Sequence, residues 1–272
     1  MNKKIQKKLF LKSLEIKKNI LEVCYKYGGH VATSFSSTEI LIYLYYLNII
    51  SINTKKSNYL VVSKGHCSEL VYSILQDLKF FPKSWFIKHY AKNKFILGQH
   101  IDSKIPGVNF SSGSLGHGLP HAVGIAHGLK IKNSLKKVFV LVGDAELCEG
   151  SNWEALLIAR KLNLSNLIVL IDKNNIGSLD YLKFTSSIDP LEDKLRAFGY
   201  NVYIINNGNC FKSINKIFVK LKKNSPKVLI LNTIKGFGLK EFENDPIWHV
   251  KKITKEVYEN SISELDKKIC KI

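Results

Sequence analysis

The sequence predicts an α/β fold in which a doubly wound, mainly parallel sheet carries helices on both faces. Two short apolar runs, residues 138–142 and 167–171, have the length and the β-branched content of buried parallel strands. Leucines and a tryptophan recur between them at roughly helical spacing, which indicates a strand–helix–strand unit. Further strand-like runs alternate with helical patterns, so about five strands are expected in one sheet.

The remaining elements follow from local patterns along the chain. An amphipathic helix is expected over residues 1–27, with Gly28 and Gly29 at its end. A second helix over residues 38–47 would be capped by Ser36 or Ser37. Residues 80–98 are expected to form a helix and a mobile connection. Further helices are expected at 119–130, 153–162, 189–198, 211–222 and, at the periphery, 254–272. The strands are expected at 59–62, 138–142, 167–171, 202–205 and 228–231.

Length and composition indicate one large soluble domain over residues 1–272. The chain is 45% hydrophobic and 23% charged, and it contains no apolar run long enough to span a membrane. The first 20 residues mix lysines with apolar residues and show no cleavage site, which argues against a secretory signal. The five cysteines are odd in number and form no CxxC pair, so reduced thiols and a cytoplasmic location are expected.

The formal net charge of +19 raises the question of a nucleic-acid partner. Only Arg160 and Arg196 are arginines, although base readout and bidentate phosphate binding favour arginine. The lysines are spread along the whole chain, as drift toward A/T-rich codons would produce. This pattern argues against nucleic-acid binding, whereas an acidic partner or a field that attracts sugar phosphates stays open.

Polar residues follow the two central strands and suggest a cation site. A right-handed crossover would place Asp144 and Asn174 at the carboxyl ends of neighbouring strands, where open α/β sheets bind ligands. Mg²⁺ prefers oxygen ligands, and the carboxylate, the amide and the backbone carbonyl of Ile176 would supply three. For either side chain alone, a helix cap or a turn is the simpler explanation.

Histidines and glycines mark other possible binding segments. His30 follows the first helix, and His66 lies in a Ser-Lys-Gly-His turn after a strand. A glycine-rich loop at 113–118 precedes a helix, and backbone N–H groups of such a loop can cradle an anion. Each feature also has an ordinary structural explanation, as a capping histidine, a packed histidine or a simple turn.

A wider set of motifs makes the interpretation specific. The string GDAELCEGSNWEA, followed by LIVLIDKNNIGSLD, is similar to the diphosphate and metal motif of thiamine-diphosphate enzymes. Together with GGHVATSFSSTEIL, VVSKGHCSELVYSIL, the KGFG turn and PIWH, it resembles the amino-terminal subunit of split transketolases from about Gly28 to Lys252. The resemblance implies the thiamine-diphosphate-binding fold, thiamine diphosphate as cofactor, and Mg²⁺ or, in its place, Ca²⁺ or Mn²⁺.

The resemblance also implies roles for individual residues. Those implied are Asp144, Asn174 and Ile176 as metal ligands; His66, Gly113, Ser114, Leu115, Gly143, Ala145, Asn174 and His249 as cofactor contacts; and His30, His100 and His249 as catalytic histidines facing the donor sugar. Ala145 replaces the second glycine of the common GDG, so the backbone there is expected in an ordinary region of φ. Glu149 aligns with an acidic residue that helps to connect two active sites across a dimer, and a surface salt bridge is the alternative. His117 and His121 have no implied role.

The family's chemistry needs a second domain, which binds the aminopyrimidine and supplies a glutamate. Nothing after Lys252 is long enough to be that domain, so a partner chain, the carboxy-terminal transketolase subunit with the pyrimidine-binding domain, is expected in a dimer of heterodimers. The implied reaction transfers a two-carbon ketol unit between sugar phosphates. A related ketol-transferase with another acceptor, such as a carrier-protein thiol, and a non-catalytic relic are the alternatives; retention of the motif residues argues against the relic.

Overall fold

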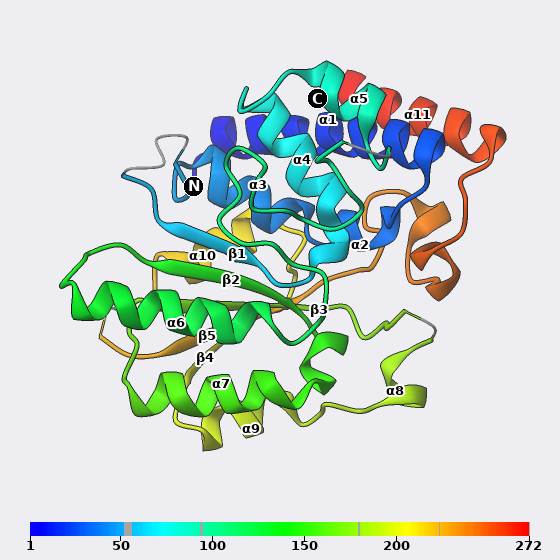
Figure 1. Ribbon diagram of the computed structural model, residues 1–272. Coiled ribbons are helices and arrows are strands. Elements are labelled where there is room, and N and C mark those ends of the chain that lie inside the picture. The colour runs from blue at the N-terminus through cyan, green and yellow to red at the C-terminus, as the bar shows by residue number, and fades with distance from the viewer. Residues whose placement is uncertain (52–55, 93–94, 179, 223, 272) are drawn as a thin grey trace.

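The computed structural model describes residues 1–51, 56–92, 95–178, 180–222 and 224–271. Five parallel strands form one sheet in the order β1-β2-β3-β5-β4, with helices on both faces (Figure 1). This architecture confirms the predicted α/β fold class. The strands are β1 (Tyr59–Val62), β2 (Val138–Gly143), β3 (Leu167–Lys173), β4 (Asn201–Ile205) and β5 (Lys227–Asn232).

Two helical layers enclose the sheet. Helices α1, α3, α4, α10 and α11 share one hydrophobic core with the sheet, whereas α6, α7 and α9 share the other. The α-helices are α1 (Lys3–Tyr27), α2 (Val31–Ser36), α3 (Thr38–Tyr46), α4 (Ser68–Asp77), α5 (Lys83–His89), α6 (Gly118–Ile131), α7 (Gly150–Lys161), α8 (Leu182–Thr185), α9 (Leu191–Ala197), α10 (Phe211–Phe218) and α11 (Lys255–Cys270). Short 3₁₀ helices are η1 (Gly65–Cys67), η2 (Ala145–Cys148), η3 (Lys240–Phe242) and η4 (Pro246–His249).

The strands are buried on both sides, which explains why they appear in the sequence as unbroken apolar runs. Successive residues of β2 alternate between the cores: Phe139 and Leu141 pack toward α1 and α3, whereas Val140 and Val142 pack toward α6 and α7. The sheet is therefore fixed from both faces. Its carboxyl edge, where the polar motifs lie, is consequently a rigid platform.

One local expectation about helices is wrong, and one helix was not predicted. Val31–Ser36 forms the separate helix α2, which the sequence pattern did not indicate. Ser37 precedes α3 but makes no side-chain capping bond. The hydroxyls of Ser36 and Ser37 instead donate to the carboxylate of Asp172, which lies at the end of β3. The end of α1 is as expected, because Gly28 follows it with a φ of 76°.

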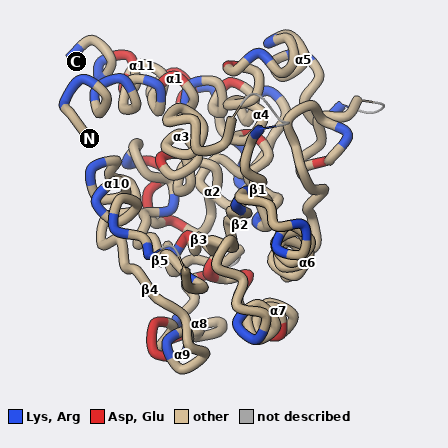
Figure 2. Tube along the Cα trace, turned by 90° about the vertical axis from the view of Figure 1, so that its left-hand side faces the viewer, with Lys and Arg blue, Asp and Glu red and all other residues tan. Residues whose placement is uncertain are grey.

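Charged side chains are distributed over the whole fold. Figure 2 shows lysine and arginine positions on α1, α6, α7 and α10, which lie on opposite sides of the sheet. In the part of the chain that the structure describes, no helix combines the length and the apolar character needed to cross a membrane. Helix α11 packs along α1, where Tyr25 and Tyr258 stack with ring centroids 4.6 Å apart.

Candidate active site

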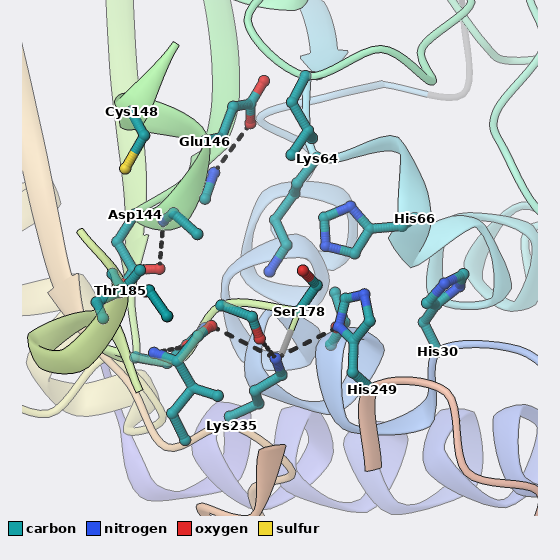
Figure 3. A pocket seen from close by; sticks show the side chains of 18 of the residues that line it. His30, Lys64, His66, Asp144, Glu146, Cys148, Ser178, Thr185, Lys235 and His249 are labelled. Atoms are coloured by element: carbon teal, nitrogen blue, oxygen red, sulfur yellow. Dashed lines mark hydrogen bonds between the residues drawn. The ribbon is translucent and has the colours of Figure 1, made fainter. Parts of the chain in front are cut away.

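A cavity of about 430 Å³ opens at the carboxyl ends of β1, β2 and β3 and continues to the segment after β5. Its lining includes most residues that the sequence singled out (Figure 3): His30, His66, His100, Gly113, Leu115, Gly143, Asp144, Ala145, Asn174, Ile176 and His249. Ser114 is exposed and is not among the lining residues. Segments that are far apart in sequence thus meet around one cavity.

The register of the central strands brings Asp144 and Asn174 to the same edge of the sheet. Gly143 pairs with Asp172 across β2 and β3, and the Asp144 N–H donates to the Asp172 carbonyl at 3.2 Å. The N–H of Asn175 donates to the Asp144 carboxylate. The two polar clusters are therefore in direct contact, as parallel neighbouring strands require.

The same residues also make local turn contacts. The Asp144 carboxylate accepts the N–H of Ala145 at 2.8 Å where η2 begins, and the Asn174 amide oxygen accepts the N–H of Ile176 at 3.1 Å. Ala145 is absent from the described residues with positive φ, in agreement with the expectation of an ordinary backbone there. These contacts orient both oxygens along the cavity wall. The turn interpretation and the ligand interpretation are therefore compatible.

The oxygens on this wall suit a hard divalent cation. Asp144 is 1% exposed, and burial, followed by the charge of Asp172, raises the pKa of Asp144 to about 6. A nearby cation would offset the free-energy cost of burying the ionised carboxylate. The available donors are one carboxylate, one amide and the Ile176 carbonyl, which is the kind of oxygen set that Mg²⁺ binds while keeping water and phosphate as further ligands.

Lys235 is a second charged group of the cavity that the sequence analysis did not single out. Its ammonium donates to the Gly177 carbonyl at 2.6 Å and to the Ile176 carbonyl at 3.4 Å, and it lies 3.4 Å from Nδ1 of His249 (Figure 3). Burial, then the nearby charge of Lys64, lowers the pKa of Lys235 to about 8. The lysine therefore provides positive charge beside the oxygen wall.

The turn that carries Lys235 depends on glycine. Gly236 has a φ of 82°, and a Cβ there would lie 1.9 Å from the carbonyl oxygen of Phe242. Its N–H donates to the Ala32 carbonyl at 2.9 Å, which attaches the turn to α2. The Thr-Ile-Lys-Gly motif after β5 was the available sequence signal for Lys235.

Four histidines form the other wall. The ring centroid of His30 lies 5.7 Å from His66, 6.5 Å from His100 and 5.1 Å from His249. Burial is the main cause that lowers the pKa values of His30, His66 and His249, the last to about 3. These three imidazoles are therefore neutral at pH 7, and each can both donate and accept a hydrogen bond.

His30 is held by a buried carboxylate that the sequence analysis also missed. Glu69 accepts the backbone N–H of His30 at 2.8 Å, the hydroxyl of Ser34 at 2.9 Å and the hydroxyl of Tyr90 at 2.7 Å. The His30 side-chain Nδ1 is buried and has no hydrogen-bond partner among the described residues. This nitrogen lies 3.9 Å from the Glu69 carboxylate, so the same acid that fixes the His30 backbone also lies beside its ring.

Glu146 joins three loops of the cavity. Its carboxylate accepts from the Ser63 hydroxyl, from the Gly116 N–H at 3.1 Å and from the Gly143 N–H at 3.1 Å. Other residues of these motifs lie outside this network. Glu149 is exposed, and His121 stacks on Phe110 with ring centroids 4.3 Å apart.

Comparisons with known proteins agree with this geometry. Residues 22–259 match the sequence model of the family described as transketolase, thiamine diphosphate binding domain. A transketolase from Campylobacter jejuni has a similar fold, with a TM-score of 0.83 at 24% identity over 100% of this chain and 48% of that chain. The transketolase from Leishmania mexicana gives a TM-score of 0.84 at 23% identity, over 97% of this chain and 41% of that one.

Curated relatives include separate subunits of similar length. One subunit of the apulose-4-phosphate transketolase of Actinobacillus succinogenes is 37% identical over 88% of each chain. The 6-deoxy-6-sulfo-D-fructose transketolase subunit of a Clostridium strain is 32% identical over 93% of this chain and 94% of its own length. With a family match over most of its length, the chain belongs to the transketolase family, and its counterpart there is the amino-terminal, thiamine-diphosphate-binding subunit.

Proposed function

We propose that the chain is the amino-terminal subunit of a split, cytoplasmic transketolase that transfers a two-carbon ketol unit from a ketose phosphate to an aldose phosphate. The observation that carries the proposal is the meeting of an oxygen wall, a buried lysine and four histidines around one cavity. When bound, thiamine diphosphate supplies the nucleophilic carbon and the electron sink for this chemistry. The chain's own residues would bind and orient the cofactor and the sugar, and would neutralise the charge of the diphosphate.

The oxygen wall would hold Mg²⁺. Asp144, Asn174 and the Ile176 carbonyl match the ligand preferences of this ion, and the raised pKa of Asp144 marks a carboxylate that a cation would stabilise. Lys235 and His66 lie at the same cavity and would donate to the cofactor's diphosphate. Glycines 113 and 143 and the backbone of Ala145 would allow close approach of the cofactor.

The histidine wall would face the donor sugar. His30 and His249 lie on the side of the cavity away from Asp144 (Figure 3), and His100 also lines the cavity. Their ring nitrogens could bind hydroxyls. The position of His30 supports this role, because its ring lines the cavity while Glu69 fixes its backbone N–H. Proton transfer to and from those hydroxyls would use the same nitrogens.

A partner would complete the site. The relatives named as separate transketolase subunits have the length of this chain, which supports a second polypeptide that carries the pyrimidine-binding domain, in a dimer of heterodimers. Those relatives carry the names of apulose 4-phosphate and of a sulfonated fructose, which favours a second possibility. In that case the ketol donor differs from xylulose 5-phosphate while the reaction class stays the same.

The test mixes the purified chain with the pyrimidine-binding chain of the same organism, Mg²⁺ and thiamine diphosphate. Ketol transfer to ribose 5-phosphate is then measured from xylulose 5-phosphate and, in parallel, from apulose 4-phosphate. Product from either donor, abolished by Asp144→Asn, is the expected result. Two chains that fold, associate and yield no product from any ketose phosphate would contradict the proposal, and turnover by this chain alone would contradict the shared site.

A further inference from the structure

A closed set of polar side chains lies directly behind the cavity. The Asp172 carboxylate, 1% exposed, accepts the hydroxyls of Ser36 at 2.6 Å and Ser37 at 2.8 Å, and it also accepts Lys64 and the hydroxyl of Thr233. We refer to these five residues as the Asp172 cluster. It connects the ends of β1, β3 and β5 with the junction between α2 and α3, which are four segments far apart in sequence.

The members of the cluster stand in a regular relation to the cavity. Three of them precede a cavity residue by two positions in the chain: Lys64 with His66, Asp172 with Asn174, and Thr233 with Lys235. Each of these strand ends carries one residue of the cluster and, two positions further along the chain, one residue that lines the cavity.

Lys64 differs from Lys235 although both line the cavity. The Lys64 ammonium is shared among Asp172, the Ser37 hydroxyl at 3.0 Å and the Ser36 hydroxyl at 3.4 Å, which uses its three hydrogens within the cluster. Burial alone would lower the pKa of Lys64, but the neighbouring groups, Asp172 foremost, together outweigh it and hold that pKa above the ordinary value. Lys64 therefore neutralises Asp172 and has no donor left for a ligand.

We propose that Asp172, neutralised by Lys64, is a positioning residue that sets the spacing of His66, Asn174 and Lys235 and thereby the cavity's affinity for a metal diphosphate. A buried ion pair contributes little net stability compared with apolar residues of the same size, so stability alone does not account for it. Its four donors come from three segments other than its own strand, the α2–α3 junction and the ends of β1 and β5, and this is the arrangement that fixes geometry. The inference rests on the proposed function, because it assigns the cavity a metal and a diphosphate.

The first test separates stability from binding. Lys64→Met leaves Asp172 buried without a counter-charge and should lower Tm strongly, whereas Lys64→Met with Asp172→Asn removes both charges and should recover most of the loss. Binding of Mg²⁺ with thiamine diphosphate to the full chain is measured by isothermal titration calorimetry. The double variant should still bind at least about tenfold more weakly than wild type. Wild-type affinity in a double variant of recovered Tm would overturn the inference.

A milder pair of variants does not depend on the ion pair. Thr233→Val removes one donor to Asp172. Thr38→Val removes a buried hydroxyl that donates to the Ser34 carbonyl at 2.9 Å, a contact outside the Asp172 cluster. Thr233→Val should weaken binding about threefold or more, and Thr38→Val should leave it unchanged. Equal effects of the two would overturn the inference. Failure of the wild-type chain, alone and with its partner, to bind the metal diphosphate would overturn the proposed function as well.

Discussion

Gly118 is the position where adding one methyl group should most directly displace the cavity's glycine-rich loop. It begins α6, and a Cβ there would lie 2.4 Å from Oγ, 2.6 Å from Cβ and 2.7 Å from Cα of Ser63. Two of these three atoms cannot move without the backbone at the end of β1. Gly118→Ala must therefore shift the start of α6, and the loop before it, away from Ser63.

The expected cost is that of overpacking, about 1–3 kcal/mol of unfolding free energy. The matched control is Gly124→Ala in the same helix, where a Cβ would meet nothing within 4 Å. That change should stabilise the chain by about 0.5–1 kcal/mol, because glycine is a poor helix former. The two variants should consequently differ by about 1.5–4 kcal/mol.

Urea unfolding followed by circular dichroism measures this difference, and equal m values show that it is a difference in stability. Gly118→Ala should also weaken cofactor binding, because Ser63 donates to Glu146 and Glu146 holds the N–H groups of Gly116 and Gly143. A Gly118→Ala chain as stable as Gly124→Ala would refute the reasoning about this contact.

Two further predictions concern lysines. Lys235→Met should weaken binding of thiamine diphosphate about tenfold or more, because it removes a charged donor, whereas the exposed neighbour Lys240→Met should not; calorimetry that finds equal affinities would argue against a diphosphate contact. Lys227 donates to the Ser165 carbonyl, and burial lowers the pKa of Lys227 from 10.5 to about 8. Between these values the unfolded state binds more protons, so stability should rise with pH by about 1–3 kcal/mol, after allowance for solvent screening. Lys227→Met should flatten that rise in urea titrations, and an unchanged slope would contradict it.

The strands were predictable because burial on both faces leaves a direct mark on the sequence. Residues 59–62 were expected as a strand, and β1 has those bounds. The prediction that Ser36 or Ser37 caps α3 was wrong because their hydroxyls bond Asp172, which lies 136 and 135 positions away. Local patterns favour the nearest partner, and here a distant one provides a buried acceptor.

The cavity itself was partly predictable. The parallel crossover was sufficient to bring Asp144 and Asn174 together, because strand direction fixes which ends meet. Lys64 and Lys235 gave no signal by residue type in a chain with 41 basic residues. Their position at the carboxyl end of a strand was the informative feature. Glu69 was missed because it is the second residue of α4, 39 positions from His30, and only the fold brings the two together.

The positive net charge therefore does not indicate where the buried charged groups of this protein make their contacts. Within the described ranges, the buried acidic side chains are Glu39, Glu69, Asp144, Glu146 and Asp172. Each accepts hydrogen bonds from a segment of the cavity or from a neighbour of one; Glu39, for example, binds Lys17 at 2.6 Å and Asn209 at 3.1 Å, and Asn209 accepts the Ile234 N–H beside Lys235. A carboxylate is removed from water at a high cost unless several donors replace it, so each fixes those donors in space. The few buried acids, rather than the many surface lysines, hold the cavity's shape.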